Sequence, residues 1–152
     1  MYVILCYMNI YLDNCCLNRP FDNQSDPRIH LESEAIKTII RLIEADIWQL
    51  VTRKVLLFEI NNTPDEQRRR NLHGINKMAS KCIETTTSIR NRAKYFEIFG
   101  LQAFDAAHLA CAENNANVLL TVDNRFRKRA NTIEDINIEV KNPLQWLEEV
   151  LK

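Results

Sequence analysis

The 152-residue sequence lacks several features that would assign it to a common class of protein. It has no internal repeat and no low-complexity segment, and it has no net charge, because 20 Lys and Arg residues balance 20 Asp and Glu residues. No overall excess of positive charge therefore attracts a polyanion. Any contact with nucleic acid has to come from a local patch of basic residues.

The cysteines do not form a pattern typical of disulfide-rich or zinc-binding proteins. Their number is five, which is odd; no two are spaced as CxxC, and Cys15 and Cys16 are adjacent. This distribution suits neither a disulfide framework nor a zinc site. It predicts a reducing compartment, and we expect a cytoplasmic protein.

The sequence also has no apolar run long enough to cross a bilayer. The first residues, 1–8, are apolar, but they include no basic segment and no evident small-residue cleavage site follows them, so we expect no export signal. Two interpretations stay open for residues 1–7. They are either an extension before the first strand, with Met8 as the true start, or a stretch that lengthens this strand.

The length fits one domain, residues 1–152, that can bury roughly two thirds of its unfolded surface. Strand-like and helix-like patterns alternate along it. Strands are expected at 9–13, 47–51, 118–122 and 136–140, a loop at 14–27, and a weak strand or linker at 85–89. A helix is expected after Pro27, and a second one, capped by Thr52, is expected to run to Asn61 or Asn62. A long helix is expected to begin at Thr63-Pro64, with Pro64 in its first turn. The remaining helices are expected at 91–99, at 103–114 after a stop at Gly100, at 125–130, and from Asn142-Pro143 to the end.

Two acidic residues come directly after apolar strands. Asp13 follows Ile10-Tyr11-Leu12, and Asp123 follows the run 118–122. Continuous apolar runs are typical of strands that are buried on both faces, as in parallel α/β sheets, whose carboxyl ends are where ligands bind. We therefore expect these two carboxylates to converge on one crevice.

Two further acids lie in apolar helical segments. Asp105 begins a strongly apolar run, 106–112, and Glu59 ends the apolar stretch 55–58. Charges in such surroundings need partners. Asp13, Glu59, Asp105 and Asp123 are therefore candidates for a single site.

The segments around these acids resemble the PIN-domain nucleases, a family that includes the VapC-like ribonuclease toxins. The resemblance covers nearly the whole chain, and its most specific parts are the helix from Asp105 and the end of the strand before Phe126. The matching segments are Tyr11-Leu12-Asp13, Leu57-Phe58-Glu59-Ile60, residues 104–112 (FDAAHLACA) and residues 119–126 (LLTVDNRF).

The resemblance implies a three-layer α/β/α sandwich with a mainly parallel central sheet. It also implies an acidic cluster of Asp13, Glu59, Asp105 and Asp123 that holds Mg²⁺ or Mn²⁺ for phosphodiester hydrolysis. The chain departs from the family at Asn14, where many members have Thr or Ser. This difference leaves open the supporting role of position 14, but does not affect the four ligands.

Carboxylates suit this chemistry independently of the resemblance, because hard divalent cations prefer oxygen ligands and keep several waters. We expect Asp13 to be the most direct ligand, Asp105 and Asp123 to bind directly or through water, and Glu59 to bind the metal or orient the attacking water. Thr121 lies two residues before Asp123, so both point to the same face of a strand. Its hydroxyl is expected to position a carboxylate or a metal-bound water.

Each acid also has a simpler explanation. Asp105 and Asp123 are suited to cap helices, Asp13 to begin an Asx turn, and Glu59 to lie on a solvated helix face. Four such coincidences in the order of one family are less frequent than one shared site, so we favour the metal cluster. His108 is expected to be a packed, hydrogen-bonded residue of the core rather than a ligand.

Basic residues form two clusters, at 68–70 and at 125–129. Arg125 and Arg129 share one helical face close to Asp123 and are candidates for binding backbone phosphates, with Arg19 as a weaker candidate. The alternative is a solvated helix face paired with Glu134 and Asp135. For the cluster at 68–70 we favour a solvated face or a protein contact.

The sequence and its resemblance to the PIN-domain nucleases thus predict a Mg²⁺- or Mn²⁺-dependent endoribonuclease, in a family that includes the toxins of toxin–antitoxin pairs. We expect RNA as substrate, an inhibitory antitoxin that inserts a basic side chain into the acidic site, a homodimer, and no association with membranes. The main alternative is a PIN-like module without activity that binds protein or RNA. A receiver-like phosphoacceptor domain is less consistent with the sequence, because no acidic pair adjoins Asp13.

Overall fold

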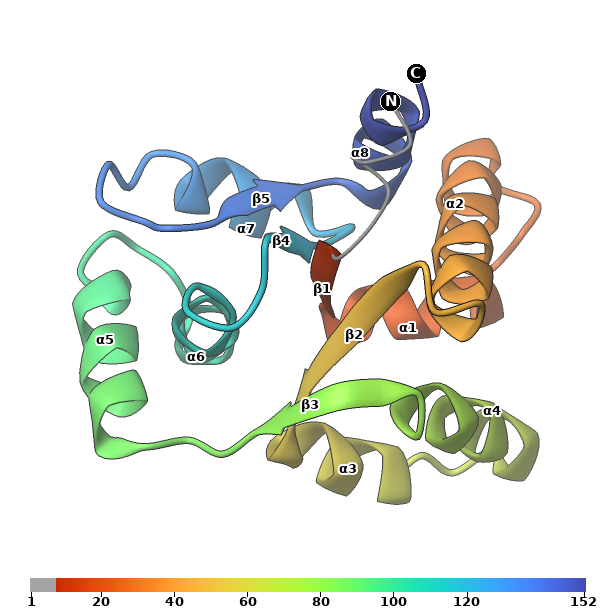
Figure 1. The fold of residues 1–152 in the computed structure, drawn as a ribbon, viewed down its shortest axis with the longest axis horizontal. Helices are drawn as coiled ribbons and strands as arrows, with labels where there is room; N and C mark the ends of the chain where they lie inside the picture. Colours follow the sequence, from red (N-terminus) through yellow and green to blue (C-terminus); the bar gives the residue numbers. More distant parts are fainter. Residues whose placement is uncertain (1–7) are drawn as a thin grey trace.

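The five strands of the central sheet all run parallel, in the spatial order β3-β2-β1-β4-β5 (Figure 1). This computed structural model describes residues 8–152, so both interpretations of residues 1–7 concern a segment outside the described residues. The strands are β1 (Met8–Leu12), β2 (Trp48–Arg53), β3 (Ala79–Ile83), β4 (Val118–Leu120) and β5 (Glu139–Lys141). The parallel α/β class expected from the apolar runs is confirmed.

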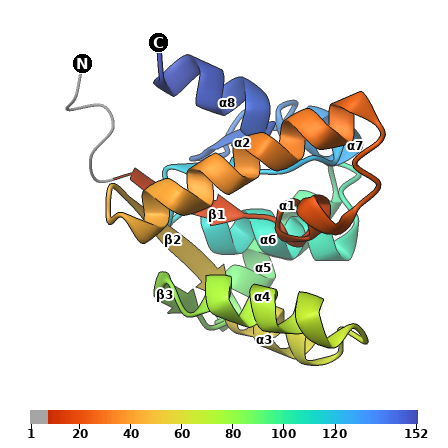
Figure 2. The same ribbon diagram turned by 90° about the vertical axis from the view of Figure 1, so that its right-hand side faces the viewer.

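Helices cover both faces of the sheet, which gives the predicted three-layer α/β/α sandwich (Figures 1 and 2). One face packs against side chains from α1 (Asn14–Asn18), α2 (Pro27–Glu44), α3 (Lys54–Asn61), α4 (Glu66–Asn76) and α8 (Pro143–Val150). The other packs against α5 (Thr87–Glu97), α6 (Ala103–Ala112) and α7 (Asn124–Ala130). The face with α1, α2, α3, α4 and α8 holds the first core, and the face with α5, α6 and α7 holds the second core. Because side chains alternate along a strand, Ile10 and Leu12 lie in the first core and Tyr11 lies in the second.

Two tryptophans anchor the first core. Trp48 at the start of β2 and Trp146 in α8 are both buried, and their ring centroids are 4.9 Å apart. Such aromatic pairs contribute large buried areas. Both tryptophans are therefore core residues that join β2 to α8.

Three expectations about the first half of the chain were wrong in detail. The segment 14–27 is not only a loop, since it forms α1 and a short 3₁₀ helix, η2 (Arg19–Phe21), before Asp26 caps α2. Burial of Cys16 and Leu17 explains why α1 forms in a polar sequence. Thr52 does not cap α3 but lies inside β2, and Pro64 precedes the α4 cap, Asp65.

The largest correction concerns β3, which the sequence did not predict. The long helix expected after Thr63 ends at Asn76, and β3 follows it. Of the segment 85–89, only residues 85 and 86 are linker. Thr86 caps α5, and this helix begins at Thr87 rather than at residue 91. The last strand also starts later than expected, at Glu139.

The connection of the strands fixes where a ligand crevice is expected. The chain proceeds from β1 outward to β2 and β3, and then returns to the other side of β1 for β4 and β5. In open parallel sheets, ligands bind at the carboxyl ends of the strands where the direction of winding reverses. This point lies between β1 and β4.

Within residues 8–152, no helix is both long and apolar enough to span a membrane.

Candidate functional site

Asp13 lies at the carboxyl end of β1, at the point where the winding of the sheet reverses. It is 6% exposed, and its carboxylate Oδ2 accepts a hydrogen bond from Thr121 Oγ1 at 2.9 Å and one from Cys15 Sγ at 3.3 Å. The other oxygen, Oδ1, lies 3.5 Å from His108 Nε2. The Asp13 side chain makes no capping bond to α1, so it does not form the Asx turn considered as an alternative. The contacts of its side chain with Thr121, Cys15 and His108 therefore fix its orientation.

Thr121 connects two of the predicted acids. Its hydroxyl donates to Asp13 and accepts the backbone N–H of Asp123 at 3.1 Å. The hydroxyl thus holds a carboxylate at the β1–β4 crevice, which is one of the two roles expected for it. Asn14 Oδ1 accepts from Asn18 Nδ2 at 3.0 Å, and Asn14 lines a hollow together with Glu59, so its supporting role stays a prediction.

Asp105 faces the same crevice from α6. It occupies the third position of this helix, and Gln102 is the N-cap, so Asp105 is not the helix cap that its simpler explanation requires. Burial, together with the negative charges of Asp13 and Asp123, raises the pKa of Asp105 to about 6. Asp13 and Asp123 are therefore close enough to oppose the ionisation of Asp105.

Asp123 combines a structural role with a position in the site. Its Oδ1 accepts the backbone N–H groups of Arg125 at 3.0 Å and Phe126 at 3.1 Å, which caps α7. The residue is exposed, and its charge contributes to the raised pKa of Asp105. The cap and the proposed ligand are thus compatible.

Glu59 lies in α3, which follows β2, the neighbour of β1 on the side away from β4. It is half-buried, and its Oε1 is buried without a hydrogen-bond partner among the described residues. Burial raises the pKa of Glu59, the Asp13 charge raises it further, and the positive charge of Arg53 opposes both. A solvated helix residue would not leave an oxygen buried and unpaired. The charge of Asp13 thus affects the pKa of both Glu59 and Asp105, and the charge of Asp123 affects the pKa of Asp105.

Arg53 is a site residue that the sequence reading missed. It ends β2, two residues beyond the Tyr11–Val51 pair of the β1–β2 ladder, just as Asp13 lies two residues beyond Tyr11. It is 7% exposed, and its Nε and Nη1 are buried with no partner in the part of the chain that is described. A charge at the end of an apolar strand was the clue that identified Asp13, and it applies equally to Arg53.

His108 is a packed residue of the core, as expected. Its Nδ1 lies 2.6 Å from the Tyr11 hydroxyl, and both side chains are buried. Burial lowers the pKa of His108, and the nearby Arg53 lowers it further while Asp13 opposes the shift. A neutral imidazole that spans Tyr11 and Asp13 helps to orient the central carboxylate.

The acids influence one another in pairs, Asp13 acting on Glu59, and Asp13 and Asp123 acting on Asp105. Among residues 8–152, no three Asp, Glu, His or Cys side chains are arranged to hold one metal ion together. Mg²⁺ commonly binds through one or two carboxylates and completes its shell with water and substrate phosphate. The unpaired Oε1 of Glu59 and the mutual repulsion at Asp105 both fit a divalent cation. The ligand roles of the four acids stay a prediction.

Two of the three candidate phosphate-binding arginines border the acids. A hollow of about 230 Å³ is lined by Gly100, Leu101, Gln102, Asp105, Asp123, Arg125, Phe126 and Arg129. Arg19 instead points toward α2, where its Nη2 lies 2.8 Å from the buried Glu32 Oε1, and its Nη1 lies 3.2 Å from Asp22. Arg125 and Arg129 are thus better placed than Arg19 for phosphate contacts.

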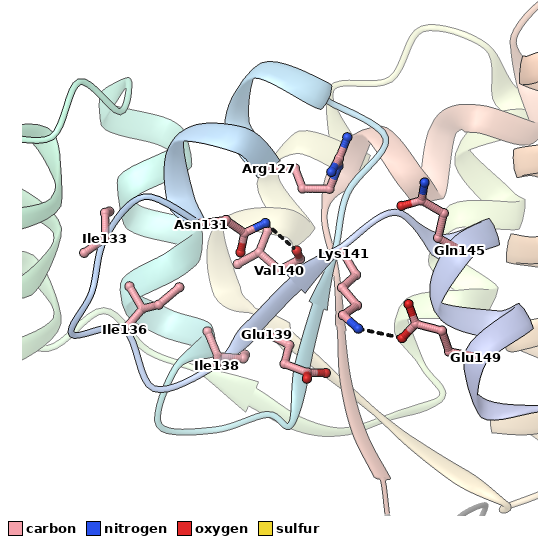
Figure 3. Close-up of a pocket in the computed structure, with 10 residues that line it drawn as sticks. All are labelled: Arg127, Asn131, Ile133, Ile136, Ile138, Glu139, Val140, Lys141, Gln145 and Glu149. Carbon is pink, nitrogen blue, oxygen red and sulfur yellow. Dashed lines mark hydrogen bonds and ion pairs between the residues drawn. The ribbon is translucent and has the colours of Figure 1, made fainter.

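A second hollow, of about 440 Å³, lies along β5 (Figure 3) and contains none of the four acids. Two contacts of its lining residues are drawn there. Asn131 Nδ2 donates to the Val140 carbonyl at 3.2 Å, and Lys141 Nζ lies 2.5 Å from Glu149 Oε2. Arg127 and Lys141 are its basic lining residues. Because none of the four acids lines this hollow, we do not assign the chemistry to it.

Comparison with solved structures supports the fold. FitAcB from Neisseria gonorrhoeae matches with a TM-score of 0.57 and 16% sequence identity, over 88% of this chain and 97% of that one. VapBC2 from Rickettsia felis, solved bound to a DNA fragment from its promoter, matches with a TM-score of 0.52 and 14% identity, over 89% of this chain and 98% of that one. No protein-family model and no curated protein matches the sequence. The chain has a PIN-like, VapC-like fold, as its motifs predict.

Proposed function

We propose that this protein is a Mg²⁺- or Mn²⁺-dependent endoribonuclease that acts as the toxin of a toxin–antitoxin pair. The observation that carries the proposal is the position of Asp13 at the switch point of a PIN-like sheet, joined through Thr121 to Asp123, which lines one hollow with Asp105. Two of the four have a pKa raised by burial and by a neighbouring acid. Such clusters of perturbed acids in a crevice are typical of functional sites.

Each of the four acids would have its own role in binding the cation or the attacking water. Asp13 is held by Thr121, by Cys15 and beside His108, so it is the best-fixed candidate for direct binding of the cation. Asp105 and Asp123 would bind directly or through water, and Glu59 would bind or orient the attacking water. The cation, when bound, would lower the pKa of water and offset charge on the phosphate oxygens.

The neighbouring basic side chains suit a nucleic-acid substrate. Arg125 and Arg129 line the same hollow as Asp105 and Asp123, so they can bind phosphates on either side of the cleaved bond. These contacts carry no base recognition. RNA as the substrate, the homodimer and the antitoxin partner rest on the likeness to PIN-domain toxins. An antitoxin that inserts an Arg or Lys among the acids would inhibit by neutralising them.

A cleavage assay tests the activity. The purified protein should cut a labelled single-stranded RNA in Mg²⁺ or Mn²⁺ and not in EDTA, and Asp13→Asn and Asp123→Asn should each abolish cutting. Both variants should remain folded, because Asn retains a side-chain oxygen that can accept from Thr121 at position 13 and can cap α7 at position 123. Circular dichroism and thermal unfolding in EDTA check this.

Asp46→Asn provides a matched control. Asp46 lies between α2 and β2, at the amino end of the strands and therefore away from the acids, and its φ of 59° is tolerated by Asn. This variant should cleave at the rate of the unchanged protein. Normal cleavage by both Asp13→Asn and Asp123→Asn would refute the enzymatic proposal.

A further inference from the structure

Arg53 is a buried cation in the acidic site whose Nε and Nη1 have no hydrogen-bond partner among residues 8–152. Its side chain is enclosed at the carboxyl end of β2, with 7% of the residue exposed. Arginine stays charged at any physiological pH, and a buried charge without hydrogen bonds destabilises the fold. An unsatisfied group of this kind needs an explanation.

Neighbouring acids supply charge but no hydrogen bonds. The positive charge of Arg53 opposes the raised pKa of Glu59, so the two side chains influence each other. Even so, Nε and Nη1 of Arg53 and Oε1 of Glu59 all lack partners within residues 8–152. A structural ion pair would satisfy these atoms by joining them. Their arrangement instead leaves donors and an acceptor beside Asp13 for a third group.

We propose that Arg53 binds a non-bridging oxygen of the phosphate group that is cleaved in this site. The inference rests on the proposed function and adds to it a residue that contacts the reacting group. Guanidinium is well suited to this contact, because its planar fork of donors matches phosphate oxygens. It lies beside Asp13 and Glu59, whereas Arg125 and Arg129 line the hollow near Asp105 and Asp123.

The contribution of Arg53 to the reaction is electrostatic. In hydrolysis a water oxygen forms a bond to phosphorus and gives up a proton, while the bond from phosphorus to the leaving ribose oxygen breaks and that oxygen gains a proton. Charge spreads over the other phosphate oxygens as this happens. Arg53 neither gains nor loses a proton. It stabilises these oxygens from a site that is fixed in advance and shielded from water.

The simpler alternative is that Arg53 only compensates the charge of the acids in the absence of metal. The two roles predict different effects of removing the charge. If Arg53 only compensates, Arg53→Gln should tighten Mn²⁺ binding and leave cleavage at saturating Mn²⁺ unchanged. If Arg53 binds the phosphate, cleavage at saturating Mn²⁺ should fall although Mn²⁺ binds at least as tightly.

The experiment compares Arg53→Gln and Arg53→Lys with Arg41→Gln as a control. Arg41 carries the same charge on the exposed surface of α2, one turn before this helix ends near the amino edge of the sheet. At saturating Mn²⁺, Arg53→Gln should lower kcat for RNA cleavage by about 10²- to 10³-fold, as expected for loss of a fixed donor in the transition state. Arg53→Lys should retain part of the activity, because it keeps the charge but loses the fork.

Stability and Mn²⁺ affinity are measured on the same variants. Thermal unfolding of Arg53→Gln should occur at an equal or higher temperature, because replacing an unsatisfied buried charge is often neutral or stabilising. Mn²⁺ affinity, by calorimetry, should be unchanged or tighter. Full cleavage by Arg53→Gln at saturating Mn²⁺ would overturn the proposal.

A measurement on the protein without substitutions tests the proposal even if the Arg53 variants do not fold. The ¹⁵N signal of the Arg53 Nε–H group should shift when inorganic phosphate is added with Mg²⁺, and no shift would overturn the proposal. A protein that does not cleave RNA but shows the shift would refute the nuclease and keep Arg53 as a phosphate ligand. A protein that cleaves RNA, with no shift and no loss in Arg53→Gln, would refute only the role of Arg53.

Discussion

Asp13 is the residue through which the contacts of the site converge. Two hydrogen bonds reach its Oδ2, from Thr121 and Cys15, and His108 lies beside its Oδ1. The charge of Asp13 also raises the pKa of both Glu59 and Asp105. A single buried carboxylate is therefore fixed in orientation and coupled to the acids on either side, as expected of a central metal ligand.

Asp105 provides a test of this coupling through pH. Its pKa is raised to about 6 from an ordinary value of 3.8, so between these values the folded protein holds a proton that the unfolded chain has lost. The stability associated with Asp105 is therefore present below pH 3.8 and is lost as pH rises through 6. Without metal, Asp105→Asn should be more stable than the unchanged protein at pH 8, and this difference should vanish near pH 4.

Urea unfolding in EDTA from pH 4 to pH 8 measures this difference. Asp105 is half-exposed, so solvent screening makes the gain smaller than the pKa shift alone suggests. The exposed Glu148 in α8 offers a control, Glu148→Gln, for which no pH-dependent difference is expected. A constant difference for Asp105→Asn at all pH values would contradict the coupling.

The four acids were recognisable as candidates in the sequence, whereas Arg53 was not. Asp13 and Asp123 were identifiable because each ends an apolar strand, and Asp105 and Glu59 because each adjoins an apolar helical segment. Arg53 ends the strand Leu50-Val51-Thr52 in the same way, but a basic residue does not suggest a metal site. The burial of Arg53, and the lack of hydrogen-bond partners for its Nε and Nη1 among residues 8–152, follow from the packing around the β1–β2 pair, which the sequence does not show.

At the level of elements, the turn between α5 and α6 supports one edge of the site. Gly100 in this turn has a φ of 90°, which L-residues with side chains rarely adopt, and a Cβ at this position would collide with the guanidinium of Arg129. Both residues line the hollow that includes Asp105 and Asp123. The glycine thus permits the turn and leaves room for a candidate phosphate-binding side chain.

The two glycines of the chain give a paired test of this role. Gly100→Ala should destabilise the protein by about 1–2 kcal/mol, mainly through backbone strain, because the flexible end of Arg129 can move away. Gly74→Ala should stabilise it by up to about 1 kcal/mol, since Gly74 lies within α4 and a Cβ there meets nothing within 4 Å. Chemical denaturation measures both, and equal effects would contradict the assignment of strain to the α5–α6 turn.

Prediction of the elements succeeded where burial dominates and failed where it does not. The central strands β1, β2 and β4 are mostly buried and were all expected. The edge strand β3 was not expected, because Ser80, Lys81 and Cys82 are exposed and give no apolar run. Its backbone pairing with β2 holds it in the sheet, and such pairing leaves little trace in a sequence.

At the level of the whole molecule, the sheet separates two cores that share its central strands. Leu12 of β1 contributes to the first core and Tyr11 to the second, and both tryptophans lie in or against the first. Since each strand serves both cores, neither is expected to persist without the other. The chain should therefore unfold as one cooperative unit, as a single domain of this length usually does.

A substitution in one core, observed from the other, tests this cooperativity. Leu109 in α6 is fully buried in the second core, so Leu109→Ala should lower the free energy of unfolding by about 2–5 kcal/mol. Tryptophan fluorescence reports only on the first core, through Trp48 and Trp146, whereas far-UV circular dichroism reports on both. In urea, the two probes should shift together and give one transition. If fluorescence kept its original midpoint while dichroism lost amplitude earlier, the two halves would unfold separately, and residues 8–152 would not be one cooperative domain.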